Sequence, residues 1–214
     1  HVASLPVATS LQPVWHLAAQ PTGRVILLGT HTGQARDARL FLASFDTATG
    51  QVRTIRGPKV QYPNFTTDMV TWWRGDGIHG PHAVLAADLS RMLSDEGISR
   101  AEVIRSGDFV AMGASAARLG DDTWIAWCDN AEGTFTVRIA TERSDWQSTP
   151  LSAEGRYACI PDIVQAPGGM HVAWNASPVP EGGIPDFSTS DIVSTRVRLA
   201  RNIAGYPFLK RMTP

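Results

Sequence analysis

The stretch that decides the fold comprises residues 121–175, which read DDTWIAWCDNAEGTFTVRIATERSDWQSTPLSAEGRYACIPDIVQAPGGMHVAWN. A short apolar run at 124–127 meets a turn-forming segment rich in Asp, Asn, Glu and Gly at 129–133. In the following run, 134–140, aromatic and β-branched residues occupy every second position. Alternation with a period of two is typical of a β-strand with one buried face. The stretch therefore predicts short strands separated by turns.

This pattern recurs along the chain. After the Pro-Gly-Gly turn at 167–169, a second apolar run ends in Trp174, as the earlier run ends in Trp127. Equivalent runs begin at residues 25, 69, 123 and 170, separated by 44, 54 and 47 residues. This spacing is near the length of a four-stranded blade, and no helix-length amphipathic pattern lies between the runs. The sequence predicts an all-β fold, a β-propeller of about four four-stranded antiparallel blades, either complete or part of a larger wheel.

Tryptophan recurs near the ends of these runs. One thin sheet has two apolar faces, so neighbouring blades must stack on each other to bury both. Trp73, Trp127 and Trp174 are expected to pack between blades. Adjacent residues of a strand point to opposite faces, so Trp72 and Trp73 cannot share a side. For Trp72 and Trp124, the sequence leaves open whether the ring packs in the core or stacks on a sugar.

Composition limits the classes of partner. The 214 residues carry a formal net charge of −1, and 43% of them are hydrophobic. A chain of this length buries a substantial core in one domain or two small ones. Because there is no basic excess, we expect no nucleic acid partner. No apolar run approaches the roughly 18 residues of a membrane-spanning helix. The chain opens with His1 and shows no signal peptide, as expected of a processed or partial product.

The chain has two cysteines, Cys128 and Cys159. The first ends a predicted second strand and the other opens the innermost strand of the next blade. Their spacing matches no metal-binding motif, so we expect neither a metal nor a cofactor. Two buried free thiols are the favoured interpretation, and pairing of the two sulfurs stays open.

A family resemblance is carried by several segments in a fixed order, namely 15–33 (WHLAAQPTGRVILLGTHTG), 60–65 (VQYPNF), 69–75, 121–130 and 157–174. Together these segments resemble sialidase-like propellers built from bacterial neuraminidase repeats, over residues 13–177. The strict Asp-box, Ser-x-Asp-x-Gly-x-x-x-Trp, is absent, and only residues 144–146 echo it. Such propellers include glycoside hydrolases, polyuronate lyases and glycan-binding modules. The resemblance therefore implies an oligosaccharide or polysaccharide ligand and an extracellular or periplasmic location.

The candidate catalytic residues are His16, Tyr62, Arg74 and His79. A uronate lyase needs a cation on the substrate carboxylate, a base for the C5 proton and an acid for the departing oxygen. Arg74 fits the first role and Tyr62 the third. His79 or His16 fits the second, because imidazole titrates near neutral pH. Each residue also has a structural interpretation, as a core histidine, a loop residue or a strand cap.

The candidate substrate-binding residues are His31, Trp72, His82 and Trp124. The two histidines lie near predicted loops of the first two blades, and the two tryptophans offer planes on which sugars stack. The structural alternative is loop shaping for His82 and core packing for the tryptophans.

The C-terminal segment carries a different likeness. Residues 190–208 read SDIVSTRVRLARNIAGYPF and resemble the start of the catalytic domain of ATP:guanidino phosphotransferases, such as arginine kinases. That resemblance implies that Arg196 and Arg198 bind nucleotide phosphates, because planar guanidinium groups bind phosphate oxygens in pairs. The same residues alternate in character, so 190–199 also fit the third strand of a fourth blade.

The sequence thus divides into propeller blades at 13–177, a linker at 178–189 and a segment at 190–214. The last segment either completes the fourth blade or begins a truncated kinase-like domain, and we favour truncation. The leading functional hypothesis is a propeller that recognises or processes a glycan by lyase or hydrolase chemistry. The alternatives are a non-catalytic propeller that binds carbohydrate or protein, and a fragment of a protein with a phosphotransferase domain. Self-association or further domains are the ways in which an incomplete wheel would close.

Overall fold

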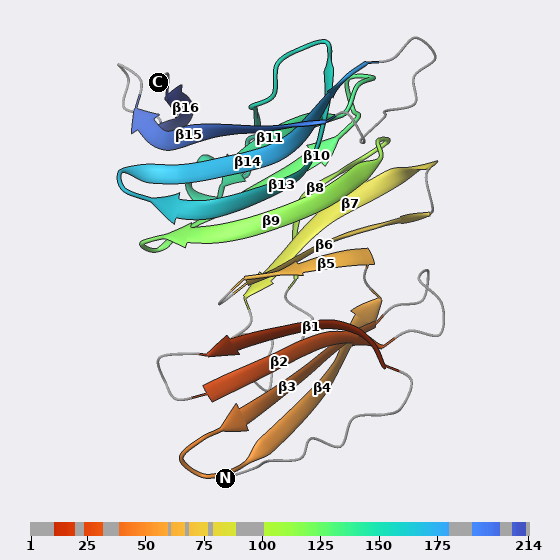
Figure 1. The fold of residues 1–214 in the computed structure, drawn as a ribbon, viewed down its shortest axis with the longest axis vertical. Helices are drawn as coiled ribbons and strands as arrows, with labels where there is room; N and C mark the ends of the chain where they lie inside the picture. Colours follow the sequence, from red (N-terminus) through yellow and green to blue (C-terminus); the bar gives the residue numbers. More distant parts are fainter. Residues whose placement is uncertain are drawn as a thin grey trace.

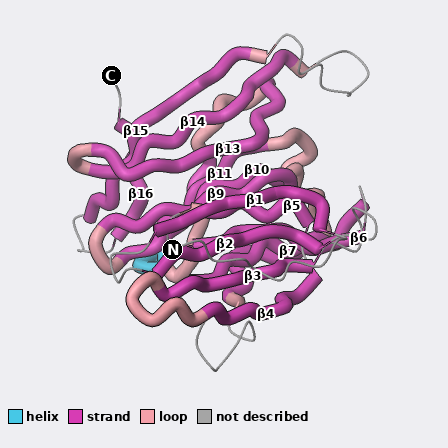
Figure 2. Tube along the Cα trace, turned by 60° about the horizontal axis from the view of Figure 1, so that its bottom comes forward, coloured by secondary structure: helices cyan, strands magenta, loops and turns pink. Residues whose placement is uncertain are grey.

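The structure is a computed structural model, and it describes residues 11–19, 24–31, 39–59, 61–66, 69–76, 79–88, 101–179, 190–201 and 207–212. Side chains are described for part of these residues, mainly 69–75, 81–88, 101–179 and 190–198. The described chain is almost entirely β-strand, with a single short 3-10 helix, η3 (Glu142–Ser144) (Figure 2). The prediction of an all-β fold is confirmed.

The strands form four antiparallel sheets of four, each in sequence order. Blade 1 comprises β1 (Leu11–Ala19), β2 (Arg24–His31), β3 (Arg39–Asp46) and β4 (Val52–Lys59), and blade 2 comprises β5 (Gln61–Phe65), β6 (Met69–Asp76), β7 (His79–Asp88) and β8 (Glu102–Gly107). Blade 3 comprises β9 (Ala111–Leu119), β10 (Asp122–Asp129), β11 (Thr136–Thr141) and β12 (Thr149–Pro150), and blade 4 comprises β13 (Arg156–Ala166), β14 (Gly169–Pro178), β15 (Asp191–Arg201) and β16 (Pro207–Met212). The predicted propeller of four-stranded antiparallel blades is confirmed.

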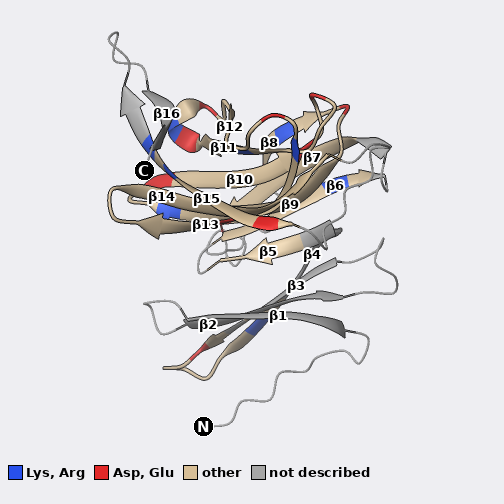
Figure 3. Ribbon diagram, turned by 45° about the horizontal axis from the view of Figure 1, so that its top comes forward, with Lys and Arg blue, Asp and Glu red and all other residues tan. Residues whose placement is uncertain are grey.

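Blades 2, 3 and 4 stack in order, with their first strands β5, β9 and β13 at the centre of the stack (Figure 1). Blade 1 lies at the blade 2 end of the molecule (Figures 1 and 3). Acidic and basic residues are intermixed over blades 2 to 4, in keeping with the net charge of −1 (Figure 3). The first strands therefore surround the propeller axis, and the turns between strands lie at its two ends.

Every first strand carries a register shift against its second strand. Such a bulge bends the strand and increases its twist. At the bulge of β9, Gly113 has φ of +67°, and a Cβ there would lie 3.1 Å from the backbone Cα of Ile160 in β13. Blades 3 and 4 therefore approach closely at this point. The shifts lie between Gln12 and His16 in β1, between Gln61 and Asn64 in β5, opposite Trp127 and Cys128 in β9, and between Cys159 and Asp162 in β13.

Among the described residues, two buried apolar layers flank blade 3, one on each of its faces. All eight residues of β10 are buried, because this strand lies between both layers. Ile125 and Trp127 pack toward blade 2, whereas Trp124, Ala126 and Cys128 pack toward blade 4. The alternation along one strand thus places its neighbours in different layers, as the period of two predicts.

The tryptophans recur in equivalent positions, with one correction in blade 2. Trp73, Trp127 and Trp174 are buried, as expected. Trp73, however, packs toward blade 3. Trp72 lies on the opposite face, across from the register shift of β5, as Trp174 lies across from that of β13. Trp72 is therefore the blade 2 counterpart of Trp174, because the bulge and not the end of the apolar run sets the register.

Residues 191–201 form β15, the third strand of blade 4, between β14 and β16. Thr195 and Val197 are buried, while Arg196 and Arg198 are exposed on the other face. This is the strand alternation noted for 190–199. Most of the expected linker, residues 180–189, lies outside the described part of the chain.

Candidate functional site

A pocket of about 500 Å³ lies on blade 2, at the end of the propeller where β6 meets β7. It contains two of the predicted site residues, Arg74 and His82. The described residues that line it are Arg74, Gly75, Pro81, His82, Ala83, Ser106 and Gly107. Three strands of one sheet therefore build the pocket.

The strand register explains its shape. Arg74 of β6 pairs with Ala83 of β7, which pairs with Ser106 of β8, so the three residues form a row across one face of the sheet. His82 pairs with Gly107 in the next row, whose side chains point to the opposite face of the sheet. The pocket lining takes residues from both rows, and Arg74 is exposed beside it. Among the described lining residues, Arg74 is the one that carries a charge, and this charge is positive.

His82 is held rigidly at the edge of this pocket. Its side chain is only 2% exposed, and its ring stacks on Trp73 with centroids 4.9 Å apart and planes 10° from parallel. Its Nδ1 atom accepts a hydrogen bond from the backbone N–H of Ala111 in β9, at 3.1 Å. A neutral imidazole that accepts at Nδ1 carries its hydrogen on Nε2. The Nε2 atom has no hydrogen-bond partner among the described residues, which leaves one buried donor unsatisfied.

Gly75 is required beneath this ring. A Cβ at position 75 would lie 2.1 Å from Cδ2 and 2.5 Å from Nε2 of His82. The imidazole thus fills the space that any other side chain at position 75 would need. The sequence Arg-Gly in β6 therefore serves both the charge of the pocket and the placement of the histidine.

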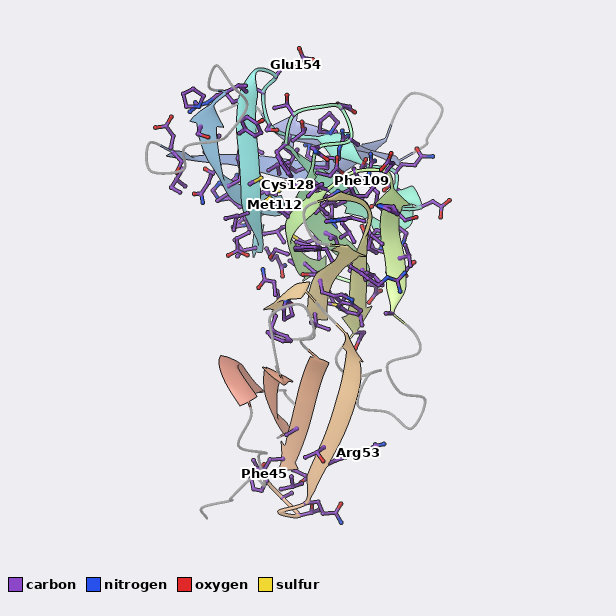
Figure 4. The ribbon with its side chains drawn as sticks, turned by 90° about the vertical axis from the view of Figure 1, so that its right-hand side faces the viewer. Phe45, Arg53, Phe109, Met112, Cys128 and Glu154 are labelled. Carbon is purple, nitrogen blue, oxygen red and sulfur yellow. The ribbon has the colours of Figure 1, made fainter. Side chains whose placement is uncertain are left out.

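A buried ion network fixes the neighbouring end of blade 3. Asp129 is fully buried and accepts hydrogen bonds from Nε1 of Trp127 at 2.7 Å and from Nε of Arg138 at 3.2 Å. Nε of Arg105, on β8 of blade 2, lies 3.2 Å from the same carboxylate. The guanidinium of Arg105 also lies over the ring of Phe109, 5.3 Å from its centroid (Phe109 is labelled in Figure 4). The network therefore joins blades 2 and 3.

Arg138 is charged within this network. Burial acts to lower the pKa of its guanidinium, but the hydrogen bond to Glu132 and the charge of Asp129 outweigh burial, and the pKa is raised. Nη2 of Arg138 lies 2.6 Å from Glu132. Asp129 is thus buried and fully paired with cations and donors, which indicates a structural role. Sequence reasoning missed it, and the only local signal was the Trp-x-Asp pattern before the turn.

The predicted site residues lie in several parts of the fold. Arg74 and His82 line one pocket. His79 begins β7, opposite Asp76 and near the pocket in the backbone. Three more predicted residues lie on first or second strands: Tyr62 at the register shift of β5, His16 directly after the register shift of β1, and His31 at the end of β2. The side chains of these three residues and of His79 lie outside the described part of the chain.

The two predicted tryptophan platforms are core residues. Trp72 is 2% exposed and Trp124 is fully buried. Neither ring offers an exposed face on which a sugar can stack, because both are covered by packing within and between blades. The exposed residues Arg196 and Arg198 lie on blade 4, whereas the pocket is on blade 2.

The described residues contain no group of three or more His, Cys, Asp or Glu side chains placed to hold a metal ion. They also contain no helix with the length and hydropathy that crossing a bilayer requires.

Comparison with known proteins gives a fold likeness. No protein family profile and no curated protein sequence matches the chain. Among solved structures, it is similar to a thermostable family-43 glycoside hydrolase, with a TM-score of 0.50 and 10% identity over 94% of this chain and 74% of that one. It also aligns with an α-L-arabinofuranosidase from Lactobacillus brevis (TM-score 0.48, 9% identity, 90% and 74% covered). A GH32 β-fructofuranosidase from Bombyx mori aligns as well (0.44, 10%, 92% and 50%).

At such low identity, the likeness to the family-43 enzyme shows the fold alone. The chain has a β-propeller fold of the kind found in glycoside hydrolases. The comparisons give no support to the phosphotransferase likeness of residues 190–208.

Proposed function

We propose that this protein is a glycan-recognising propeller and that the pocket of Arg74 and His82 binds an acidic sugar. The observation that carries the proposal is the meeting, in one hollow of about 500 Å³, of an exposed arginine and a buried histidine with an unsatisfied donor. A fold shared with glycoside hydrolases supports a carbohydrate ligand as the class to test first.

The chemistry of the pocket favours a carboxylate. A guanidinium forms paired, charge-assisted hydrogen bonds to the two oxygens of a carboxylate. The row Arg74, Ala83 and Ser106 adds a hydroxyl that can accept from or donate to a neighbouring sugar hydroxyl. Nε2 of His82 is itself buried, so His82 shapes the pocket while the direct contacts come from Arg74 and Ser106. Uronates and sialic acids present a carboxylate beside ring hydroxyls, so they match this set of donors.

For a reaction at this site, the proposal combines Arg74 of the pocket with the residues that the sequence analysis named as base and acid. In a uronate lyase, Arg74 neutralises the carboxylate and thereby acidifies the C5 proton, His79 or His16 removes that proton, and Tyr62 protonates the departing oxygen. Hydrolysis of the glycosidic bond is the alternative reaction, and the glycoside hydrolase fold supports it.

A non-catalytic binding module is the second candidate. It is favoured by the state of Asp129, the fully buried carboxylate at the neighbouring end of blade 3. Three hydrogen bonds, from Trp127, Arg138 and the backbone N–H of Ala131, and the charge of Arg105 already occupy this buried carboxylate, so it is not open to a substrate.

Calorimetric titration with oligogalacturonate and with its methyl ester tests the proposal, because the two ligands differ only in the carboxylate charge. Sialyllactose and lactose form a second matched pair. We expect the acidic member to bind at least about tenfold more tightly, and Arg74→Gln to remove that preference. Arg196→Gln, which changes an exposed arginine on blade 4, is the control and should leave affinity unchanged. Equal affinity for acid and ester would refute the proposed site.

Product analysis on the same mixtures separates the reaction classes. Ultraviolet absorbance of an unsaturated uronate indicates a lyase, and new reducing ends without that absorbance indicate a hydrolase. Released sialic acid indicates a sialidase. Binding without any product indicates a recognition module.

A further inference from the structure

The two cysteines meet across the interface between blades 3 and 4. Cys128 lies on β10 and Cys159 on β13, 31 residues apart in sequence, and their Sγ atoms are 2.9 Å apart. Both residues are fully buried, and both are free thiols in this structure. Cys128 lies beside Met112 in the interior of the molecule (Figure 4). Two thiols from different blades thus occupy one sealed position.

The fold fixes both partners of this pair. The alternation of β10 directs Cys128 toward blade 4. In β13 the register shift begins directly after Cys159, where Ile160 adopts φ of +54°. Two contacts flank the pair and hold β13 on blade 3: Ser115 donates to Asp162 at 2.8 Å, and Ala158 N–H donates to the carbonyl of Phe135 at 3.0 Å. The sulfurs therefore meet because of backbone geometry and not through chance rotamers.

The two sulfurs lie closer together than two thiolates that share one zinc ion. Two thiolates bound to one tetrahedral zinc lie about 3.7 Å apart, given Zn–S bonds of about 2.3 Å. The observed separation is shorter, and the described residues supply no third ligand. The thiol of Cys128 has a single hydrogen and lies within hydrogen-bonding distance of two acceptors, the carbonyl of Met112 and the sulfur of Cys159.

We propose that Cys128 and Cys159 form a disulfide that joins blades 3 and 4 when the chain folds under oxidising conditions. In this step a thiolate attacks glutathione disulfide and releases one glutathione, and the second cysteine then displaces the other. One S–S bond forms in the protein and one breaks in the oxidant. Both cysteine protons are lost, and two electrons reduce glutathione disulfide to two molecules of glutathione.

The timing of this step follows from burial. Burial raises the pKa of the Cys128 thiol, and its hydrogen bond with Cys159 raises the pKa further. Since the thiolate is the reactive form and neither sulfur meets solvent, the folded dithiol is inert. Oxidation therefore takes place during folding, before blade 4 closes on blade 3. A protein that has folded reduced stays reduced.

The test is refolding of the full chain from denaturant, once in a glutathione disulfide and glutathione mixture and once in dithiothreitol. Each sample is then unfolded without reductant, alkylated and weighed by mass spectrometry. We expect the first sample to carry no alkyl groups and a cross-link between the peptides of Cys128 and Cys159. The second sample should carry two alkyl groups. Folded reduced protein exposed to the same glutathione mixture should remain fully alkylatable after unfolding.

Stability gives a second readout. The oxidised chain should melt on the order of 10 °C above the reduced chain, because the cross-link restricts the unfolded state. Cys159→Ala should melt at the same temperature in both redox conditions. Two alkyl groups per chain in samples that refolded correctly under oxidising conditions would overturn the proposal. Rapid oxidation of the folded dithiol would overturn the proposed timing of the step. Neither result depends on whether the protein binds a glycan.

Discussion

The two faces of blade 3 are built differently. Its contact with blade 2 includes polar groups: Thr71 donates to the carbonyl of Ala114 at 2.7 Å, His82 accepts from Ala111 at 3.1 Å, and Arg105 faces Asp129 at 3.2 Å. Its contact with blade 4 is mainly apolar, with Trp124, Ile139, Met170 and Trp174 around the paired cysteines. The face toward blade 2 therefore carries polar groups, one of which has an unsatisfied hydrogen-bond donor, and the face toward blade 4 carries mainly buried apolar side chains.

This difference separates function from stability. The pocket and the unsatisfied Nε2 of His82 belong to the side of blade 2, where polar groups can exchange one partner for another. Apolar packing gains its free energy from the area that it removes from water, so separating the packed side chains loses that free energy. We therefore expect changes on the blade 4 side to alter unfolding most, and changes on the blade 2 side to alter ligand binding as well.

The largest effect is expected from Trp124→Ala. The side chain is fully buried between blades 3 and 4, so its loss leaves a large cavity. The free energy of unfolding should fall by about 3–5 kcal/mol, as measured by urea denaturation. Ile192→Ala, at a position 75% exposed on blade 4, is the control and should change it by less than about 0.5 kcal/mol. Similar values for the two variants would contradict the assignment of stability to this interface.

Asp129→Asn should have the next largest effect, on the polar face. The change keeps the shape of the side chain but removes the charge that balances Arg138, which is only 5% exposed in its side chain, and Arg105. We expect a loss of about 2–3 kcal/mol in the free energy of unfolding. Glu132→Gln is a matched control, because Glu132 is exposed and should contribute under about 1 kcal/mol. Equal losses would show that the network is a surface feature.

Gly75→Ala tests the placement of His82. The added methyl group would overlap the imidazole, so the ring must leave its stack on Trp73. We expect a loss of about 1–3 kcal/mol in stability together with weaker binding of acidic glycans. The double variant Gly75→Ala/His82→Ala separates the causes: the alanine at position 75 should then add little further loss. Additive losses would mean that Gly75 acts independently of the histidine.

Local patterns explain how much of this fold is readable from the sequence. Strand alternation and turn residues are set within a few positions, so the blades around 121–175 follow from the residues alone. The bulge of β5 is set by tertiary packing, and for that reason Trp72 and not Trp73 takes the position equivalent to Trp174. Short motifs mislead in the same way, since residues 190–199 fit a propeller strand and also resemble a nucleotide-binding segment.

The candidate site was predictable only in part. Arg74 stands out beside glycine at the end of an apolar run, and the structure places it in a pocket with His82. The burial of His82 depends on Ala111, 29 residues away, and nothing near the histidine indicates that contact. Asp129 and the meeting of the cysteines likewise depend on which blades are neighbours. Contacts between blades therefore could not be predicted from the sequence.

The smallest effect is expected at Asp122, an acid on the apolar side of β10. Burial raises the pKa of its carboxyl above the ordinary value of 3.8, although a hydrogen bond from the backbone N–H of Arg143 at 3.1 Å opposes this. A raised pKa means that the folded state holds the proton more tightly than the unfolded chain does. The contribution to stability is thus present below about pH 3.8 and is lost as the pH rises through the folded-state pKa.

Asp122→Asn removes this ionisation and keeps an oxygen that accepts from Arg143. The variant should be more stable than the parent by up to about 1 kcal/mol at pH 7 and equal to it at pH 3. Urea denaturation at the two pH values measures the difference, with Asp121→Asn, at an exposed position, as the control. A variant that is less stable than the parent at pH 7 and equal to it at pH 3 would mean that the charged hydrogen bond to Arg143 outweighs burial. The apolar face of blade 3 would then tolerate a charge, and its contrast with the polar face would lose its physical basis.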